Sequence, residues 1–427
     1  MAIIFLLVFL IVFALMGTPL AFAIGASSMS FINSFNPNFM QMLPQRVWGG
    51  VFSFVMVAMP LFMFAGELMN TGGITKRIVA FSMYLVRPFH GGLGEVNIIA
   101  SMIFGGISGS SVADTSALGS ILIPAMEKEG YSKKFAAGVT VASSTMGMII
   151  PPSVPMIVYA MASGASIGKL FIAGLVPGVL IGLSQLINVN LISIKRGYHP
   201  ERKPFDKKDF IHTMLYGLPA ILMPVVIVVF VSFGICTASE SAGIAVLYSL
   251  IIGFFFYKEL TIKDVINGLR KTLISSAAIM IIIGFTTIFT WLLTMANIPS
   301  QIATFFLSLD LPVWGYALIF DLLILMIGAF IDVTPAILLL TPILLPVMES
   351  VGLSSLQFGA MLITGLAIGL VTPPVGMCLN ACTKINKMQI TEIFKGALPF
   401  VICNVIVLIL ISIFPALTTY LPSLMSY

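Results

Sequence analysis

Charged residues are scarce in this chain of 427 residues, of which only 9% are Asp, Glu, Lys or Arg. A soluble domain carries about 25% charged residues, whereas 59% of this chain is hydrophobic. Because no water-soluble fold can hide so much apolar surface, we predict a polytopic membrane protein embedded in a lipid bilayer. Apolar runs long enough to cross a bilayer lie at 3–24, 51–70, 171–194, 214–233, 241–257, 273–296 and 399–420.

Residues that usually hold metals or perform catalysis are also few, with four cysteines and three histidines in the whole chain. Cys378 and Cys382 stand four residues apart, but no further ligands of matching type lie near them, so we interpret them as small buried side chains. The sequence contains neither a Walker A motif nor HExxH. We therefore predict no catalytic residues and no enzymatic activity, and the energy for any transport must come from an ion gradient or a partner.

The net charge of +5 is not a nucleic-acid signature, because the basic residues lie in loops, as the positive-inside rule requires. The densest basic cluster lies within 195–208, and we place it in the cytoplasm. Counting crossings from this loop makes the two halves of the chain inverted relative to each other. It also places the N-terminus outside, with one or two spans in 1–35.

A repeat divides the chain into two halves, 1–212 and 213–427. Helix-breaking residues recur at a constant offset of 222 positions, from Pro124 to Pro346 and from Gly147 to Gly369. A repeat of this kind in an apolar chain is typical of transporters that contain broken helices. The predicted fold is therefore an all-α polytopic membrane protein with inverted repeats, two re-entrant hairpins and two broken helices.

Each half is predicted to contain frame helices, an interfacial segment, a hairpin, a broken helix and a closing helix. For the first half we expect the hairpin at about 93–128, the broken helix at about 133–163 and the closing helix at 171–194. For the second half we expect an interfacial arm at 258–271, the hairpin at about 313–349, the broken helix at about 355–383 and the closing helix at 399–420. The interfacial arm is predicted from apolar residues at helical spacing between 259 and 271.

The segment 105–116 contains three glycines, five hydroxyl residues and one aspartate. Unpaired backbone is costly in hydrocarbon, so this segment must be buried in protein or line a wet cavity, as a hairpin tip would. Its counterpart, 328–335, carries Asp332 and Thr334 immediately before a proline. Two plainer interpretations stay open: the first segment could be a small-residue packing motif, and Asp332 could simply cap a helix.

A Pro-Pro pair interrupts each predicted broken helix, at 151–152 and 373–374. Proline removes a backbone donor and clashes with the preceding turn, so the helix should unwind and free carbonyl groups there. A simple kink is the alternative. Facing the tips, the freed carbonyls would complete two cation sites. We predict the first from Gly106, Ser108, Ser110, Gly147 and Ile150, and the second from Gly328, Asp332, Thr334, Gly369 and Thr372.

At these motifs the chain resembles the large membrane subunit of TRAP transporters, the tripartite ATP-independent periplasmic transporters of the DctM-like family. The resemblance covers essentially the whole chain. The motifs that carry it are the segment 105–120, Pro-Leu-Phe-Met-Phe-Ala-Gly at 60–66, Ile-Pro-Ala-Met at 123–126, Gly-Tyr-Ser-Lys at 130–133, Ile-Pro-Pro-Ser at 150–153 and Thr-Pro-Pro-Val-Gly at 372–376. In its details the chain looks most like the sialic-acid branch of the family.

The resemblance implies an elevator-type carrier in a bacterial inner membrane, with the N-terminus in the periplasm. It implies uptake of a small carboxylate driven by at least two sodium ions. It also implies two partners, a small four-helix membrane subunit on a separate chain and a periplasmic substrate-binding protein. The substrate would lie between the tips, near Ser108, Ser110, Ser111, Thr145, Pro151, Asp332, Thr334 and Pro373. The alternative is a stand-alone sodium- or proton-coupled anion carrier or antiporter of related architecture.

Overall fold

The computed structural model describes residues 2–86, 91–198 and 207–425, and within these ranges it contains helices and turns but no β-strand. Among the described residues, seven helices are long and apolar enough to cross a membrane, or up to nine if each of two bent helix pairs is counted as one span. The prediction of an all-α polytopic membrane protein is thus confirmed.

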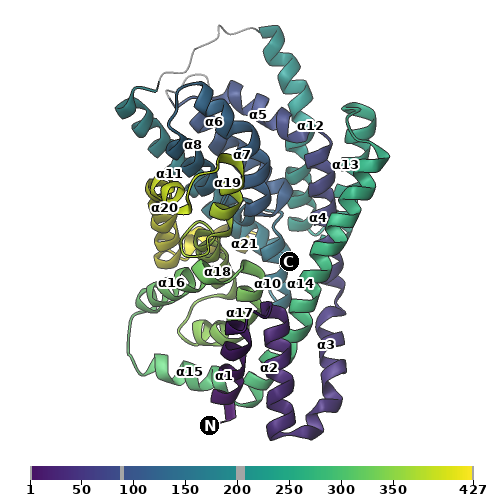
Figure 1. Ribbon diagram of the computed structural model, residues 1–427, viewed down its shortest axis with the longest axis vertical. Coiled ribbons are helices and arrows are strands. Elements are labelled where there is room, and N and C mark those ends of the chain that lie inside the picture. Colours follow the sequence, from purple (N-terminus) through teal and green to yellow (C-terminus); the bar gives the residue numbers. More distant parts are fainter. Residues whose placement is uncertain (1, 87–90, 199–206, 426–427) are drawn as a thin grey trace.

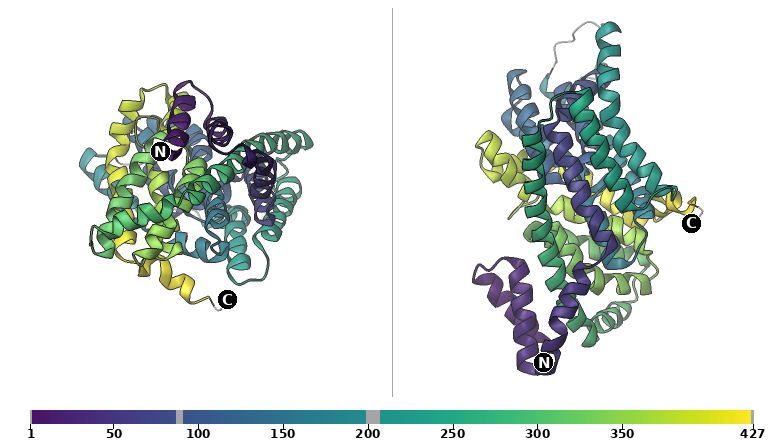
Figure 2. Two further views of the ribbon diagram at one scale, coloured as in Figure 1. Left: turned by 90° about the horizontal axis from the view of Figure 1, so that it is seen from below. Right: turned by 90° about the vertical axis from the view of Figure 1, so that its right-hand side faces the viewer.

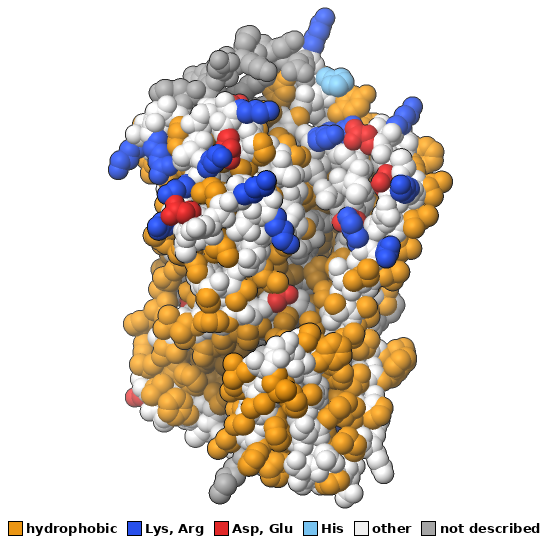
Figure 3. All heavy atoms as spheres, viewed as in Figure 1, with side chains coloured by type: hydrophobic (Ala, Val, Ile, Leu, Met, Phe, Trp, Pro, Cys, Tyr) orange, Lys and Arg blue, Asp and Glu red, His pale blue; other side chains and the backbone are white. Residues whose placement is uncertain are grey.

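Charged and hydrophobic side chains occupy different parts of the surface. On the face shown in Figure 3, Lys, Arg, Asp and Glu gather toward the end where α5, α8 and α11 lie, and a broad hydrophobic zone follows below them (Figures 1 and 3). Exposed apolar side chains include Ile187, Leu191 and Leu322. We call the charged end the basic end of the molecule.

The first half begins with α1 (Ala2–Leu15), α2 (Leu20–Phe35), the short η1 (Pro37–Met42), α3 (Leu43–Val51), α4 (Phe54–Thr71) and α5 (Ile74–Leu85). It continues with α6 (Leu93–Ser108), α7 (Ser111–Lys128), α8 (Lys133–Ser143), α9 (Met146–Ile149), α10 (Val154–Ser163) and α11 (Ile167–Arg196). The helices α6 and α7 form a tight hairpin, and α8 to α10 form one bent unit with an angle of 42°.

The second half begins with α12 (Lys207–Ser232), α13 (Ala238–Ile251), η2 (Ile252–Phe256), α14 (Ile262–Met295) and α15 (Ile298–Leu307). It continues with α16 (Val313–Phe330), α17 (Val333–Ser350), α18 (Ser355–Gly369), α19 (Met377–Asn386), α20 (Ile390–Ile413) and α21 (Ala416–Ser423). The helices α16 and α17 repeat the hairpin. In Figure 1 the hairpin α6–α7 occupies the upper part of the molecule and α16–α17 the lower part.

Equivalent residues of the repeat begin equivalent helices. Ser132 caps α8 by accepting a hydrogen bond from the Phe135 N–H (3.3 Å), and Ser354 caps α18 by accepting one from the Gln357 N–H (3.2 Å). Such caps satisfy backbone donors that have no partner in the first turn of a helix. The repeat thus preserves helix starts as well as helix breaks.

The two halves are interlocked in the interior. The second part of each broken helix packs on the hairpin of the other half, α10 on α17 and α19 on α7. The first part of one broken helix also packs on the closing helix of the other half, α8 on α20, where Gly138 and Gly396 allow the two backbones to touch. Figure 2 shows this central bundle beside the long α14 and the frame helices.

The predicted interfacial arm at 258–271 does not form a separate helix. A capping box between Thr261 and Asp264 starts α14, which then continues without interruption to Met295. Its 34 residues span about 51 Å, more than the roughly 30 Å of a bilayer core. The amphipathic spacing therefore belongs to the first turns of a long helix, because no residue after Lys271 breaks the helical backbone.

Candidate functional site

The first hairpin tip is built around Gly109, whose positive φ of 60° ends α6. Ser110 then caps α7 by accepting a hydrogen bond from the Ala113 N–H (3.4 Å). The Ser108 hydroxyl donates to the Asp114 carboxylate, and it accepts a hydrogen bond from the Ser110 N–H (3.2 Å). These bonds draw the tip and the first turn of α7 into one polar cluster.

Asp114 is the residue that the predicted ligand sets missed. It is fully buried, and its Oδ2 atom has no hydrogen-bond partner among the described residues. This oxygen lies directly against the Cα atom of Gly147, where any side chain would collide with it. The available signal was its position as the single carboxylate of the segment 105–116, but the sequence does not show where the side chain points.

The broken helix forms the opposite wall of the first tip. A Cβ atom on Gly105 would lie 3.0 Å from the Cα atom of Gly147, and one on Gly106 would lie 3.0 Å from the carbonyl oxygen of Pro151. Pro151 itself is buried, and the peptide bond between 151 and 152 is cis. The tip and the break at 149–153 are therefore in backbone contact.

The structure thus brings four members of the predicted first cation site together: Gly106, Ser108, Ser110 and Gly147. Ile150, the fifth, donates its N–H to the Met146 carbonyl (2.8 Å) and packs its side chain on Gly178 of α11.

Thr145 and Ser111, two residues predicted to bind the substrate, differ in the hydrogen bonds of their hydroxyl groups. The Thr145 hydroxyl donates to the Ala142 carbonyl (2.7 Å) and accepts a hydrogen bond from Asn404 of α20 (3.1 Å). Its hydrogen bonds are therefore made within the α8–α20 interface and not with the tip. The Ser111 hydroxyl is buried and has no partner among the residues that the structure describes.

The second tip has a simpler arrangement. Asp332 caps α17, with its Oδ1 atom accepting a hydrogen bond from the Val333 N–H (2.8 Å), and it is exposed in the isolated chain. Thr334, the second residue of α17, is buried. The hydrogen bond to Val333 agrees with the interpretation of Asp332 as a helix cap. The cap uses the Oδ1 atom and leaves the Oδ2 atom of the carboxylate for another partner.

The second break lies against the second tip in the same way as in the first half. Gly328 and Gly369 touch backbone to backbone, and the Val375 N–H donates to the Ala329 carbonyl (3.2 Å). The Thr372 hydroxyl donates to the Ile368 carbonyl (2.9 Å), and Pro373, next to it, is partly exposed. Of the predicted ligands of the second site, Gly328 and Gly369 are therefore in direct contact.

The donor atoms at both tips are carboxylate, hydroxyl and carbonyl oxygens, which are hard ligands. Within the described ranges no group of three or more His, Cys, Asp or Glu residues could hold a metal ion. One carboxylate with neutral oxygens suits a small monovalent cation better than a zinc or calcium centre, which would need more charged or softer ligands. The unpaired Oδ2 atom of Asp114 is the atom that such a cation would satisfy.

Two interlocked halves, each with a polar hairpin tip facing a helix break inside a hydrophobic bundle, define the architecture of a membrane transporter. The sequence profile described as "Tripartite ATP-independent periplasmic transporter, DctM component" matches residues 7–417. The chain belongs to this family of large permease subunits. The resemblance inferred from the sequence motifs is therefore confirmed.

Named relatives match over nearly the whole chain. The sialic acid TRAP transporter large permease protein SiaM of Vibrio cholerae is 35% identical over 96% of this chain and 95% of its own length. The C4-dicarboxylate TRAP transporter large permease protein DctM of Rhodobacter capsulatus is 31% identical over 98% of this chain and 99% of its own length. Because relatives are named as permeases, the expectation of a transport role without enzymatic activity is confirmed.

A solved structure supports the fold independently. The YdaH transporter of Alcanivorax borkumensis, described as having an unusual topology, superimposes with a TM-score of 0.66 over 90% of both chains at 14% sequence identity. At this identity the similarity concerns the fold alone. The family's large permeases work with a small subunit and a periplasmic binding protein, in a multi-pass arrangement consistent with a bacterial inner membrane.

Proposed function

We propose that this chain is the transport subunit of a sodium-driven, ATP-independent importer of a small carboxylate. A periplasmic binding protein would deliver the substrate, and a small four-helix membrane subunit on a separate chain would complete the complex. The observation that carries the proposal is the buried, unpaired Oδ2 atom of Asp114, which faces a helix break. A buried carboxylate of this kind is costly unless a cation or a proton neutralises it.

The two cation sites would lie at the two tips. Asp114, Ser108 and the backbone around Gly147 would hold the first sodium ion, and Asp332 with the backbone around Gly369 would hold the second. Bound sodium would neutralise both carboxylates and so make a substrate carboxylate tolerable between the tips. We propose sialic acid as the substrate because the Vibrio cholerae relative carries that name.

Movement of the substrate would follow an elevator mechanism. The interlocked hairpins and broken helices would slide as one body against α4, α12, α13 and α14. The N-terminus would then lie in the periplasm and the basic end of the molecule in the cytoplasm, in agreement with the positive-inside rule.

The test is uptake into proteoliposomes that contain this chain with its small subunit. Uptake of N-acetylneuraminate should require both an inward sodium gradient and the purified binding protein. Equal uptake with a potassium gradient would contradict sodium coupling. Equal uptake without the binding protein would favour the stand-alone carrier, and transport of another carboxylate would correct the substrate alone.

A further inference from the structure

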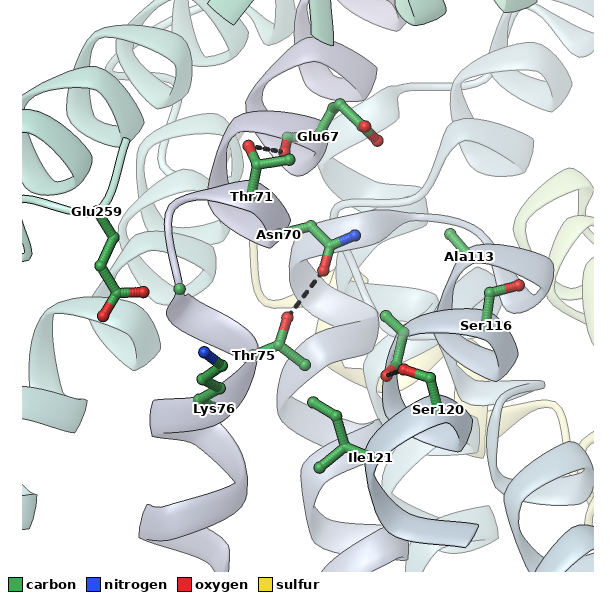
Figure 4. A pocket seen from close by; sticks show the side chains of 12 residues that line it. Glu67, Asn70, Thr71, Thr75, Lys76, Ala113, Ser116, Ser120, Ile121 and Glu259 are labelled. Atoms are coloured by element: carbon green, nitrogen blue, oxygen red, sulfur yellow. Dashed lines mark hydrogen bonds between the residues drawn. The ribbon is translucent and has the colours of Figure 1, made fainter. Parts of the chain in front are cut away.

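A polar cavity of about 500 Å³ lies between the frame and the first hairpin. We call it the α4–α7 cavity. Its frame side is formed by the end of α4, the start of α5 and Glu259, and its hairpin side by one face of α7. Figure 4 shows Asn70, Thr75 and Lys76 opposite Ala113, Ser116 and Ser120.

The cavity begins beside the first tip. Ala113, which lines it, donates its N–H to the cap residue Ser110. From Ala113 the lining follows α7 to Ser120, about 10 Å farther along the helix. Because α5 belongs to the basic end, the cavity extends from the candidate cation site toward that end.

The acidic groups of the cavity are neutralised by partners. Glu67 pairs with Lys271, and Glu259 pairs with the Arg77 guanidinium (2.8 Å), which also donates to the Gly73 carbonyl (2.8 Å). Lys76 is exposed in the cavity wall and has no acidic partner among residues 2–86, 91–198 and 207–425. The cavity therefore has an uncompensated positive charge.

The repeat provides an internal comparison. A second cavity, of about 470 Å³, lies between α3, α14, α10 and α17, and none of its lining residues, all in the described part of the chain, is charged. By the 222-residue offset, Ser116 and Ser120 of α7 correspond to Leu338 and Pro342 of α17, which line this second cavity. Of these two cavities, only the one at the basic end is lined by a lysine and by hydroxyl residues of its hairpin helix, because the hydroxyl residues of the second cavity (Ser53, Thr286, Thr287 and Thr290) lie outside the hairpin.

We infer that the α4–α7 cavity is the release vestibule for an anionic substrate, in which Lys76 attracts the carboxylate and the Ser116 and Ser120 hydroxyls bind it in passing. The inference rests on the proposed function for the direction of transport and for the identity of the anion. A lysine ammonium is a compact charge that acts at a distance, and such a charge in a cleft raises the local concentration of anions.

The first experiment tests the electrostatics without any substrate. Ser120→Cys, made in the full complex with Cys236 and Cys403 replaced by Ala, is treated from the side of the basic end with an anionic and with a cationic methanethiosulfonate reagent. We expect Ser120→Cys to react from this side, and the ratio of the anionic to the cationic rate to fall about 3- to 10-fold when Lys76→Gln is added.

The matched control is Lys195→Gln, which removes an exposed lysine at the end of α11, outside the cavity lining. It should leave the ratio unchanged. Ser116→Cys serves as a second reporter if Ser120→Cys does not assemble. A reporter that assembles but does not react from this side, or a ratio that Lys76→Gln leaves unaltered, would overturn the inference.

The second experiment measures counterflow of N-acetylneuraminate from loaded proteoliposomes. Lys76→Gln should raise the internal concentration needed for half-maximal exchange about 3- to 10-fold, with the external KM and the sodium dependence unchanged. A wild-type complex that exchanges no carboxylate would refute the proposed function. The methanethiosulfonate reaction rates of the first experiment would then still test the electrostatics of the cavity. If the wild type exchanges N-acetylneuraminate and Lys76→Gln has the same half-maximal internal concentration, the substrate does not pass through the α4–α7 cavity.

Discussion

At the scale of single residues, the two tips place their negative charges differently. Under the 222-residue offset Ser110 corresponds to Asp332, and both residues cap the second helix of a hairpin. In the first half the charge is moved one turn into the helix, to Asp114, which becomes buried. The first carboxylate is therefore enclosed by protein, and the second is exposed at the tip.

Replacing Asp114 by Asn should remove the charge and preserve the shape of the side chain. Because a single charged ligand contributes strongly to binding a small cation in a buried site, we expect the sodium concentration for half-maximal uptake to rise at least about 10-fold. Sodium titration of uptake measures this. Uptake by the control Asp310→Asn, in the loop before α16, should depend on sodium as uptake by the wild type does. An unchanged sodium dependence in Asp114→Asn would show that Asp114 is not part of the cation site.

Asp332 offers a way to separate capping from cation binding. Loss of the cap in Asp332→Ala should destabilise α17 by about 1 kcal/mol, whereas Asp332→Ser keeps a cap but carries no charge. If Asp332 binds sodium, both variants should show weakened sodium-dependent uptake at normal expression. Full recovery in Asp332→Ser would mean that the residue is only a cap.

How far the sequence predicts individual roles depends on side-chain direction. The polar composition of the tips was enough to predict Ser108, Ser110 and Asp332 as candidate ligands. Thr145 looked equivalent in composition, but its hydroxyl is bonded to Asn404, more than half the chain away, and local sequence carries no sign of that partner. Asp114 was visible for the same compositional reason, and only the tertiary structure shows its unpaired oxygen beside Gly147.

At the scale of elements, helix-breaking residues were the most informative part of the sequence. Glycine and proline act through the backbone, so their effect is local and can be read from the chain. The hairpin helices meet at Ser108–Ser111 and Phe330–Val333, inside the expected segments. The interfacial arm failed as a separate element because amphipathic spacing describes a helix face and does not show where the helix ends.

Changing Pro151-Pro152 to Ala-Ala should allow α9 and α10 to continue as one helix. The carbonyls released at the break would return to intrahelical hydrogen bonds, and the wall opposite the first tip would change. We expect the sodium affinity measured by uptake to fall severalfold. Pro177→Ala, which affects a proline inside the continuous helix α11, is the matched control. An unchanged sodium affinity in the double variant would argue against the broken-helix site.

At the scale of the whole molecule, Gly66 of α4 marks one of the closest contacts between the frame and the first hairpin. A Cβ atom on Gly66 would lie 3.0 Å from the Ile107 carbonyl oxygen and 3.4 Å from the Ser108 Cα atom. Sliding of the core against the frame, as proposed, would have to separate this contact.

A disulfide between Gly66→Cys and Ile107→Cys should therefore stop transport. In a background where Cys236 and Cys403 are replaced by Ala, oxidation should abolish uptake and reduction should restore it. Each single cysteine variant should be insensitive to oxidation. Continued uptake by a fully cross-linked protein, verified by mass spectrometry, would exclude an elevator movement at this interface.

The exchange of partners between the halves has a mechanical consequence. Since α10 packs on the hairpin α16–α17 and α19 packs on the hairpin α6–α7, the broken helix that faces each tip is also held against the hairpin of the other half. A displacement of one hairpin must displace the helix that walls the other. In the proposed carrier, occupancy of one ion site would thereby be communicated to the other through shared rigid parts, and the two sites would load and empty as a pair.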